Sequence, residues 1–349
     1  MGTLYALEVM KKVFVALSGG VDSAVAAHIL KREGWMVTGV FIRVWQPDFL
    51  ACNQDDEERA AKRVAAYLGI PFLRLDLAAE YKTAVVDAMI NEYMRGRTPN
   101  PDVLCNAEIK FGAFLDFAKE HGAEKIATGH HAQVIGGKLH RGCDPKKDQG
   151  YFLWKLTQEE LSHTLMPIGH MKKEEVRAYA EQYAIPSAHK PDSQGLCFIG
   201  QVDMKEFLKH YITTSKGAVL NEEGDSIGEH DGSEFITLGQ RSGFCLHNAN
   251  ANRKVHYVIS KNTEQNSIVV STNPNDSQEM KEAIPLTDTN WNQEVRDRDL
   301  TCEVRYHGER IACTIKNDVV HMQIPQLVAP GQSIVVYAGT ECIGGGVVA

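Results

Sequence analysis

Hydrophobic and polar positions follow two different patterns along the 349-residue chain, and the change comes near residue 217. In residues 12–135, short apolar runs alternate with longer stretches of helical spacing. The expected strands are 13–17, 36–44, 71–77 and 125–128, and the expected helices are 22–32, 55–68, 78–95 and 106–120. This alternation predicts an α/β fold, with a parallel sheet covered by helices on both faces.

The second half of the chain has a different texture. After two further expected helices, over 172–184 and 203–211, β-branched runs alternate with Gly, Asn and Asp turns, as in small antiparallel sheets or barrels. The expected strands are 235–238, 255–260, 267–271, 300–306, 311–315, 319–324 and 333–337. A polar stretch from 273 to 291 predicts a boundary, so we expect an α/β domain at 10–205 and β-rich modules at 206–273 and 280–349.

Composition places the chain among globular proteins, with 43% hydrophobic and 23% charged residues. These values exclude a wholly disordered, collagen-like or disulfide-scaffold protein. Because no apolar run is long enough to span a membrane and the N-terminus has no features of a targeting peptide, we expect a cytoplasmic protein without a membrane partner. The net charge of −8 gives no support to nucleic-acid binding, but it leaves room for a local basic surface.

The eight cysteines include no CxxC pair, so no structural zinc site is expected, and we predict no protein-held metal. In a reducing compartment most of them are expected to be small buried hydrophobic residues.

The segment Ser18–Ser23, with the sequence SGGVDS, is the strongest chemical signal. It follows the first expected strand and opens the first expected helix, where backbone N–H groups stabilise an anion and two glycines allow close approach of a phosphate. No GK[ST] follows, so this is not a Walker loop. A plain strand-to-helix turn is the alternative, but α/β sheets bind nucleotides at this position.

Two cysteines have Gly, Pro and polar neighbours. Cys105 directly precedes an expected helix, where the local potential favours a thiolate, and Asp102 lies three residues earlier, within reach for proton transfer. Cys197 follows a glycine turn in the segment DSQGLCFIG. Either cysteine, taken singly, could equally be a packed residue.

SGGVDS resembles the pyrophosphate-loop signature of the ATP pyrophosphatase group, whose members activate an oxygen as its adenylate. Across nearly the whole chain, further segments are similar, in order, to those of one family of this group, the tRNA-specific 2-thiouridylases. These segments are GRTPNPDVLCNAEIKF (96–111), ATGHH (127–131), KDQGYFL (147–153), DSQGLCFIG (192–200), TLGQRSG (237–243), VRYHG (304–308) and PGQSIVVYAG (330–339).

The resemblance implies ATP-dependent 2-thiolation of the wobble uridine of tRNA. The uracil 2-carbonyl would be adenylated, and sulfur would then be transferred from a cysteine persulfide. The implied cofactors are ATP and Mg²⁺, and the implied partners are a tRNA with a wobble uridine and a protein that carries a persulfide. Residues 10–205 would form the catalytic domain, and the module at 206–273 would contact tRNA.

The resemblance also implies roles for single residues. Cys197 would carry the persulfide, Cys105 would either form a disulfide with it or help to resolve the intermediate, and Asp102 would be the general acid/base. The implied ATP-binding residues are Ala16, Leu17, Ser18, Gly19, Gly20, Val21, Asp22, Ser23, Ile42 and Gly129. The implied tRNA-binding residues are Asn100, Pro101, Asp102, His130, Lys147, Asp148, Gln149, Arg305, Tyr306 and Gln332, of which the first three would contact a flipped-out base.

The chain departs from the family pattern at 244–252, where a glycine-rich segment is usual, and at His256-Tyr257, where a Trp-Tyr pair is usual. Three other functions remain open. An adenylating ligase that uses ammonia would not depend on Cys105 or Cys197. A nucleotide-binding sensor with an RNA-binding tail would bind ATP without forming AMP. In the third, Asp102 and the two cysteines would ligate an iron–sulfur cluster.

Overall fold

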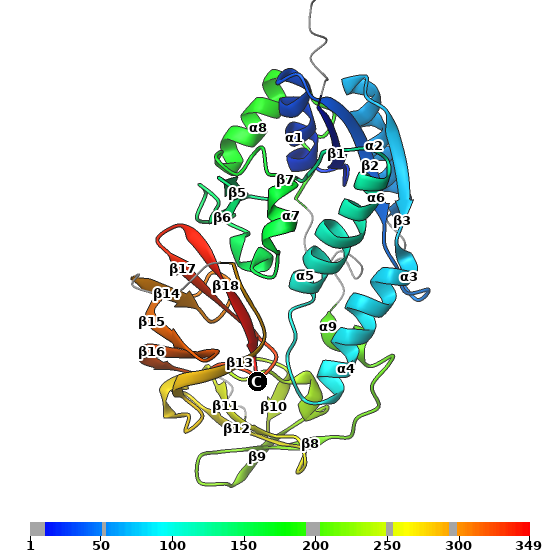
Figure 1. Cartoon of the computed structure of the whole chain (residues 1–349). Helices are drawn as coiled ribbons and strands as arrows, with labels where there is room; N and C mark the ends of the chain where they lie inside the picture. Colours follow the sequence, from blue (N-terminus) through cyan, green and yellow to red (C-terminus); the bar gives the residue numbers. More distant parts are fainter. Residues whose placement is uncertain (1–10, 51–53, 193–202, 249–253, 293–298) are drawn as a thin grey trace, which may run out of the picture. The chain divides into compact units, whose positions relative to one another are not determined.

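The computed structural model describes residues 11–50, 54–192, 203–248, 254–292 and 299–349 (Figure 1). The chain divides into two compact units. The first contains Met1–Tyr81 and Cys105–Phe198, and the second contains Lys82–Leu104 and Ile199–Ala349.

The first unit is built on a five-stranded sheet in the order β3-β2-β1-β4-β7, and every neighbouring pair is parallel. Its strands are β1 (Lys12–Ala16), β2 (Met36–Arg43), β3 (Phe72–Asp76), β4 (Lys125–Ala127) and β7 (Thr164–Leu165). The chain runs outward from β1 to β3 and then returns to β4, on the other side of β1. Open α/β sheets bind ligands at such a reversal, at the carboxyl ends of the two strands involved, which here are β1 and β4.

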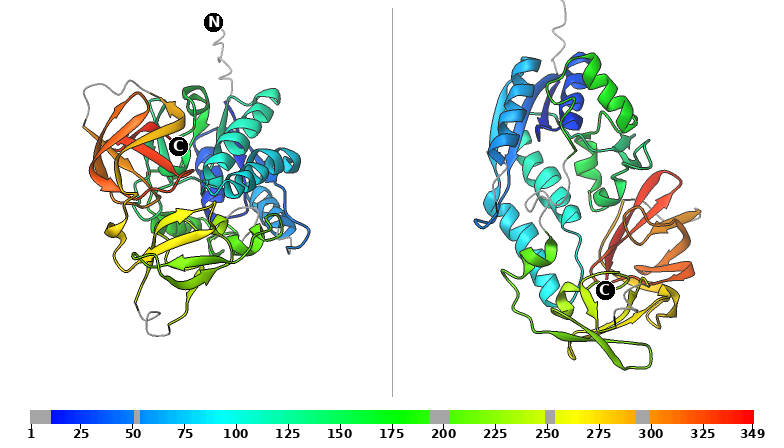
Figure 2. Two further views of the ribbon diagram at one scale, coloured as in Figure 1. Left: turned by 90° about the horizontal axis from the view of Figure 1, so that it is seen from below. Right: turned by 180° about the vertical axis from the view of Figure 1, so that it is seen from behind.

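Helices cover both faces of this sheet, as the sequence pattern predicts (Figures 1 and 2). Val13 and Val15 of β1 face a core shared with α1 (Val21–Arg32), α2 (Gln54–Leu68) and α8 (Lys173–Gln182). Phe14 faces the opposite way, and its ring lies 6.1 Å from that of Phe117 on α6 (Phe114–Glu120). The alternation of neighbouring side chains on β1 therefore anchors both helical layers.

The remaining elements of the first unit are short. They are α3 (Ala78–Tyr81), the π-helical segment η2 (Cys105–Ala113), the antiparallel hairpin β5 (Ala132–Ile135) and β6 (Lys138–Arg141), η3 (Gly150–Leu153) and α7 (Gln158–Ser162). The second unit contains three further short helices and a π-helical segment, η1 (Lys82–Asp87), α4 (Ala88–Met94), α5 (Pro101–Leu104) and α9 (Met204–Leu208). The helices expected over 78–95 and 106–120 are thus present, but π-helical turns interrupt them.

A five-stranded sheet forms the central part of the second unit, in the order β10-β9-β8-β12-β11. Its strands are β8 (Gly217–Leu220), β9 (Ser226–His230), β10 (Phe244–Leu246), β11 (Tyr257–Asn262) and β12 (Ser267–Ser271). The strand expected over 235–238 is wrong, because the chain makes a 3-10 turn there, η4 (Ser233–Phe235). Ile236, directly after this turn, is buried in the core of the sheet. Its apolar side chain gave the sequence the pattern of a strand, although the backbone there pairs with no strand among the described residues.

The C-terminal part of the second unit is a closed six-stranded barrel, coloured yellow-orange to red in Figure 2. Its strands are β13 (Lys281–Trp291), β14 (Leu300–Glu303), β15 (Ile311–Lys316), β16 (Val319–Gln326), β17 (Ser333–Ala338) and β18 (Glu341–Val348). β18 pairs with β13 and closes the ring, which leaves no open edge. The polar stretch that was expected to be a boundary begins with the short turn η6 (Pro274–Asp276). Its later part forms β13, the longest strand of the barrel.

Candidate active site

The SGGVDS segment forms the turn between β1 and α1, at the carboxyl end of β1 where the strand order of the parallel sheet reverses. Ser23 closes this turn: its hydroxyl accepts a hydrogen bond from Ser18 N at 3.3 Å and donates one to Gly20 O at 3.2 Å. Gly20 is the N-cap of α1 and offers no side chain to the first amide groups of the helix. These amide groups, with the positive end of the helix dipole, are suited to bind an anion.

Two glycines allow the main chain to come close to this turn. Gly19 has φ +73°, and a Cβ atom there would lie 2.7 Å from Glu57 O. Gly129 follows β4, and its Cβ would lie 2.5 Å from Ser23 N. Only glycine fits at either position without a shift of the neighbouring backbone. Ile42, the other residue expected near the nucleotide, is partly buried near the carboxyl end of β2.

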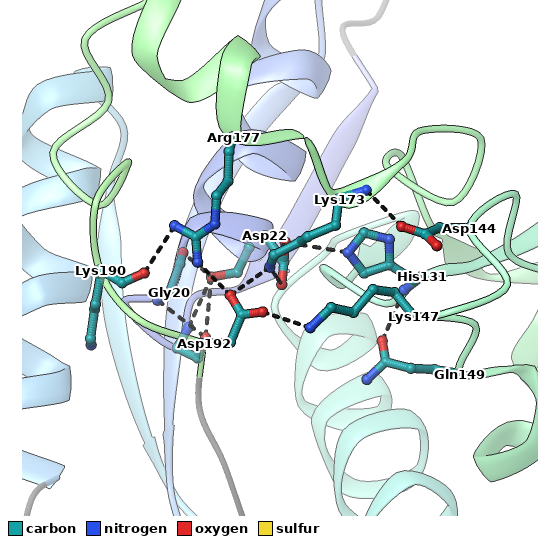
Figure 3. A network of polar contacts seen from close by, with 12 residues as sticks. Gly20, Asp22, His131, Asp144, Lys147, Gln149, Lys173, Arg177, Lys190 and Asp192 are labelled. Carbon is teal, nitrogen blue, oxygen red and sulfur yellow. Dashed lines mark hydrogen bonds and ion pairs between the residues drawn. The ribbon is translucent and has the colours of Figure 1, made fainter. Parts of the chain in front are cut away.

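A network of charged side chains lies beside the loop (Figure 3). Asp22 accepts hydrogen bonds from Lys173 Nζ on both carboxylate oxygens, each at 2.7 Å, and its Oδ1 lies 3.4 Å from His131 Nε2. Lys173 Nζ also lies 2.9 Å from Asp192 Oδ1. Two further cations pair with Asp192. Arg177 Nη2 lies 2.6 Å from its Oδ1, and Lys147 Nζ lies 2.8 Å from its Oδ2.

Both carboxylates in this network are ionised at neutral pH. Burial alone would raise the pKa of Asp22, but hydrogen bonds from His131 and Lys173 outweigh burial and leave that pKa below its usual value. Burial likewise acts to raise the pKa of Asp192, and the ion pairs with Lys147 and Lys173 lower it well below the usual range. The network is therefore charged on both sides, with cations that a polyanionic ligand could share.

Neighbouring polar groups hold the network in place. Lys173 is the first residue of α8, and its backbone N donates to Asp144 Oδ2 at 3.0 Å, which fixes the start of that helix. His131 N donates to Gln149 Oε1 at 2.9 Å. The His131 ring is buried, and its Nδ1 has no hydrogen-bond partner among the residues described. This nitrogen could receive a group of a bound ligand.

The segment Lys147–Gln149, expected to contact tRNA, folds around its middle residue. Asp148 is buried, pairs with Arg141 at 3.0 Å and accepts hydrogen bonds from the backbone N of Gly142 and of Gly150. Asp148 thereby directs its two neighbours toward the charged network. Their contact with tRNA remains a prediction.

His130 is placed as a core histidine would be. It is 8% exposed, its Nδ1 lies 2.8 Å from Thr128 Oγ1, and its ring lies 5.6 Å from that of Phe111. Burial, with the charges of Lys110 and His131, lowers the pKa of His130 well below its ordinary value, so the ring is neutral. Little of the ring is accessible to RNA, and its expected tRNA contact remains a prediction.

Of the two cysteines predicted to be catalytic, the structure describes only Cys105. Cys105 is 3% exposed and is the first residue of η2, directly after α5, whose first turn contains Asp102. Cys197 lies outside the described residues. No disulfide joins the cysteines that are described, which are Cys105, Cys143, Cys245, Cys302, Cys313 and Cys342. The proposed pairing of Cys105 with Cys197 thus stays a prediction.

The other predicted tRNA-binding residues belong to the second unit, as do Asn100, Pro101 and Asp102. Gln332 Nε2 donates to Thr98 O at 2.8 Å, so its amide holds the chain that leads to Asn100. Arg305 and Tyr306 are exposed, and the Tyr306 ring stacks on His307 with a centroid distance of 3.9 Å. An exposed aromatic pair next to an arginine is suited to stack on a nucleic-acid base.

Sequence reasoning missed Lys173, Arg177 and the ion pairs of Asp192. The helix that carries Lys173 and Arg177 was expected, but basic residues four positions apart are usual on a solvated helix face. Only the fold places α8 beside α1 and buries Lys173, whose side chain is 10% exposed. A buried lysine is rare unless it is paired, and the sequence contains no signal for that burial.

Comparison with known proteins covers nearly the whole chain. Residues 11–201 match the family model described as tRNA methyl transferase HUP domain. Residues 205–272 match the tRNA methyl transferase PRC-barrel domain, and residues 281–348 match the aminomethyltransferase beta-barrel domain. A tRNA-specific 2-thiouridylase, MnmA, of Paracidovorax citrulli is 41% identical over 364 residues, which cover 97% of this chain and 96% of that protein. The chain belongs to the tRNA-specific 2-thiouridylase family.

Another 2-thiouridylase, from Streptococcus equi subsp. zooepidemicus, is 39% identical over 353 residues, which cover 97% of this chain and 94% of that protein. A solved 4-thiouridine synthetase–RNA complex with bound ATP gives a TM-score of only 0.35 at 20% identity, over 57% of this chain and 50% of that chain. A likeness of that extent carries no argument about the site.

Membership of the 2-thiouridylase family confirms the predicted fold class, a parallel-sheet domain followed by two β-rich modules. The HUP domain with its pyrophosphate loop also implies use of ATP. In the part of the chain that the structure describes, no helix combines the length and the apolar character that crossing a membrane requires.

Proposed function

We propose that this protein is a tRNA-uridine 2-sulfurtransferase, which uses ATP to replace the 2-oxygen of a wobble uridine with sulfur. The observation that carries the proposal is the charged site beside the SGGVDS loop, where Lys147, Lys173 and Arg177 converge on Asp192 near the start of α1. Membership of the 2-thiouridylase family along nearly the whole chain supports the choice of substrate.

The loop and its surroundings fit the phosphates of ATP. Gly19 and Gly129 keep side chains away from the loop, so that a phosphate could approach its backbone closely. The amide groups at the start of α1 and three nearby cations all favour negative charge. Such an arrangement can bind the triphosphate and stabilise the charge that develops on a leaving pyrophosphate.

In the first half-reaction, the 2-carbonyl oxygen of the uridine attacks the α-phosphorus of ATP, and pyrophosphate leaves. This step converts a poor leaving group into one that departs as AMP. Mg²⁺, bound with the phosphates, would neutralise part of their charge. Among the described residues, no three His, Cys, Asp or Glu side chains come together as a metal cage. We therefore expect phosphates and water to supply most of the ligands of Mg²⁺.

In the second half-reaction, sulfur attacks C2 of the adenylated uridine, and AMP leaves with the original oxygen. The sulfur would come from a persulfide on Cys197, loaded by a donor protein that itself carries a persulfide. Attack of the Cys105 thiolate on Sγ of Cys197 would form a Cys105–Cys197 disulfide and free hydrosulfide, and a cellular thiol would later reduce the disulfide. We place the reaction in the cytoplasm, where free thiols persist.

Three residues before Cys105, Asp102 is proposed as the general acid/base of sulfur transfer. Asn100, Pro101 and Asp102 are proposed to contact the target uridine after it leaves the base stack. Hydrogen bonds of Thr98 to Pro330 and Gln332 hold the chain directly before these residues, which supports a fixed position for a base-contacting loop.

The test is a thiolation assay with ATP, Mg²⁺, sulfide and an unmodified tRNA that carries a wobble uridine. The proposal expects AMP and a thiolated nucleoside in equal amounts. If folded protein and intact tRNA give neither product, the proposal is wrong. An ammonia-using ligase would form AMP without a thiolated nucleoside, and a nucleotide sensor would bind ATP without forming AMP.

Cysteine variants separate the steps of the reaction. Cys197→Ser should lose transfer from the persulfide donor but retain AMP formation, whereas Cys143→Ser, at an exposed cysteine without an assigned role, should behave as the unaltered protein. Iron and acid-labile sulfide in anaerobically purified protein would favour the cluster alternative. With the persulfide-carrying donor as the only source of sulfur, full thiolation activity of both Cys105→Ser and Cys197→Ser would overturn the persulfide mechanism.

A further inference from the structure

Asp192 occupies a position that would suit a phosphate. Its Oδ1 accepts from Arg177 Nη2 at 2.6 Å and lies 2.9 Å from Lys173 Nζ, while its Oδ2 accepts from Lys147 Nζ at 2.8 Å (Figure 3). Three cations from two separate parts of the chain thus surround one carboxylate. Charge-assisted bonds of this kind are the usual contacts of a phosphate in a protein.

The side-chain ion pairs of this cluster contain more cations than carboxylates, since Asp144 contacts only the backbone N of Lys173 and not its ammonium group. Lys147, Lys173 and Arg177 supply three positive charges, whereas Asp22 and Asp192 supply two negative charges. A carboxylate has two oxygen atoms to share among three cations. The terminal phosphates of a nucleotide carry more charge and more oxygen atoms, so they satisfy the same cations better than Asp192 does.

The cluster is also connected to the phosphate-binding turn. Lys173 contacts Asp192 and both carboxylate oxygens of Asp22, which lies in the first turn of α1. Arg177 Nη1 in addition donates to the backbone O of Ala188 and of Lys190, so its guanidinium fixes the chain that leads to Asp192. A phosphate that reached Lys173 and Arg177 from this turn would meet the Asp192 carboxylate there.

We propose that the Asp192 carboxylate is a built-in competitor of nucleotide phosphate, so that ATP and pyrophosphate must displace it from Lys147, Lys173 and Arg177. This inference rests on the proposed function and deepens it. In the absence of a ligand, Asp192 shares the buried Lys173 with Asp22 and also pairs with Lys147 and Arg177. The same competition favours the departure of pyrophosphate after the adenylate has formed, because the carboxylate can return to the cations.

The test measures binding of ATP and of inorganic pyrophosphate by calorimetry, in the absence of tRNA, with and without Mg²⁺. Asp192→Asn removes the competing charge but keeps the shape of the side chain. The proposal expects Asp192→Asn to bind both ligands about fivefold or more tightly than the unaltered protein. Lys173→Met and Arg177→Met should bind both ligands more weakly.

Lys172→Met is the matched control, because it removes an equal charge from the exposed residue next to Lys173. It should leave the affinity for both ligands unchanged. Circular dichroism and thermal unfolding show whether each variant is folded, and Asp192→Glu, which keeps the charge, should bind pyrophosphate less tightly than Asp192→Asn.

Two results would overturn the inference. Weaker binding by folded Asp192→Asn, whether or not Mg²⁺ is present, would show that Asp192 holds the cations in place for the ligand. Weaker binding only in the presence of Mg²⁺ would make Asp192 a ligand of that ion. Either result can occur while the unaltered protein thiolates tRNA, and tighter binding can occur in a protein that does not, so the two proposals fail separately.

Discussion

At the scale of single residues, the proposed nucleotide site depends on glycines, because a side chain at these positions would clash with neighbouring backbone. Gly129→Ala would place a Cβ 2.5 Å from Ser23 N and 2.7 Å from Asp22 C. Because the clash is with backbone, we expect a loss of about 1–3 kcal/mol of stability and a clearly weaker affinity for ATP. Thermal unfolding and calorimetric ATP binding measure the two effects.

Gly122→Ala is the control for this prediction. Gly122 has φ +74°, but a Cβ there meets no atom within 4 Å. Its alanine variant should lose about 1–2 kcal/mol through backbone strain and should bind ATP normally. Unchanged ATP affinity of Gly129→Ala would show that the end of β4 does not shape the loop.

A second residue-scale prediction concerns Lys261 on β11. Its Nζ donates to Gly96 O at 2.9 Å and to Ile236 O at 2.7 Å. Burial lowers the pKa of Lys261 to about 8, although the charge of Glu234 acts in the opposite direction. Between about pH 8 and the ordinary lysine pKa, Lys261 therefore binds more protons in the unfolded chain than in the folded one. Its contribution to the free energy of unfolding rises with pH across that range.

The urea midpoint measured from pH 7.5 to 10.5 tests this expectation, as the difference between the unaltered protein and Lys261→Met. The difference should grow in favour of the unaltered protein as the pH rises. Lys281→Met, at an exposed lysine of β13, should show no such trend. A difference that is constant across this range would contradict the lowered pKa.

Prediction from the sequence placed a residue correctly where its local structure depends on its immediate neighbours. SGGVDS follows a strand and opens a helix, and both conditions can be recognised in the sequence. Lys173 lies 151 positions from Asp22, and its role depends on the packing of α8 against α1, which no local pattern reveals. The same limit applies to the partners of Asp192.

At the scale of elements, prediction from the hydrophobic pattern failed for segments whose buried positions do not recur with one period. Buried Ile284 and Leu286 of β13 alternate with exposed residues over only a few positions, and the strand also contains Pro285 and Asp288. Backbone pairing with both β16 and β18 stabilises β13 as a strand, although its pattern of apolar residues is weak. The π-helical turns were likewise not predictable, because local spacing is nearly the same in both kinds of helix.

The closure of the barrel gives a prediction at this scale. A Cβ at Gly344 on β18 would lie 2.0 Å from Asn290 O on β13, and Gly344 has φ +143°. Gly344→Ala should therefore separate the closing strands and speed amide hydrogen exchange in β13 and β18. The affinity for ATP, which depends on the first unit, should not change.

Gly339→Ala is the matched control, because Gly339 has φ +62° and no atom within 4 Å of its Cβ position. It should leave exchange in β13 as it is in the unaltered protein. Equal exchange rates in the two variants would show that the β13–β18 contact does not limit opening of the barrel.

At the scale of the whole molecule, a net charge of −8 has to be reconciled with an RNA substrate. Affinity for a polyanion then depends on local cations, and each one that contacts a phosphate contributes to the salt dependence. Arg305→Ala, at an exposed arginine beside the Tyr306–His307 stack, should weaken tRNA binding and reduce the slope of log affinity against log salt by about 1.

Filter binding of tRNA at several salt concentrations measures this slope, with Lys316→Ala as the control. Lys316 is an exposed lysine on β15 of the same barrel and has no expected contact with tRNA. A slope for Arg305→Ala equal to that of the unaltered protein would remove Arg305 from the RNA interface.

The chain also passes between the units at the proposed catalytic residues. It leaves the first unit after Tyr81 and returns to it at Cys105, so Asp102 belongs to the second unit and Cys105 to the first. Three residues of sequence separate the proposed acid/base from the proposed nucleophile. Spacing along the sequence predicted that these residues work together, and only the fold assigns them to different units.

The sequence by itself determined the parallel α/β domain, about half of the strands of the β-rich modules (β11, β12 and β14 to β17), the glycine turn between β1 and α1, and the family. These features depend on local order along the chain: periodic burial, glycines at a turn and motifs in a fixed succession. The tertiary structure alone decided which charged residues meet at the turn, that His130 and Asp148 are buried, and that β13 closes a barrel. Such contacts join residues far apart in sequence, and packing rather than local pattern brings them together.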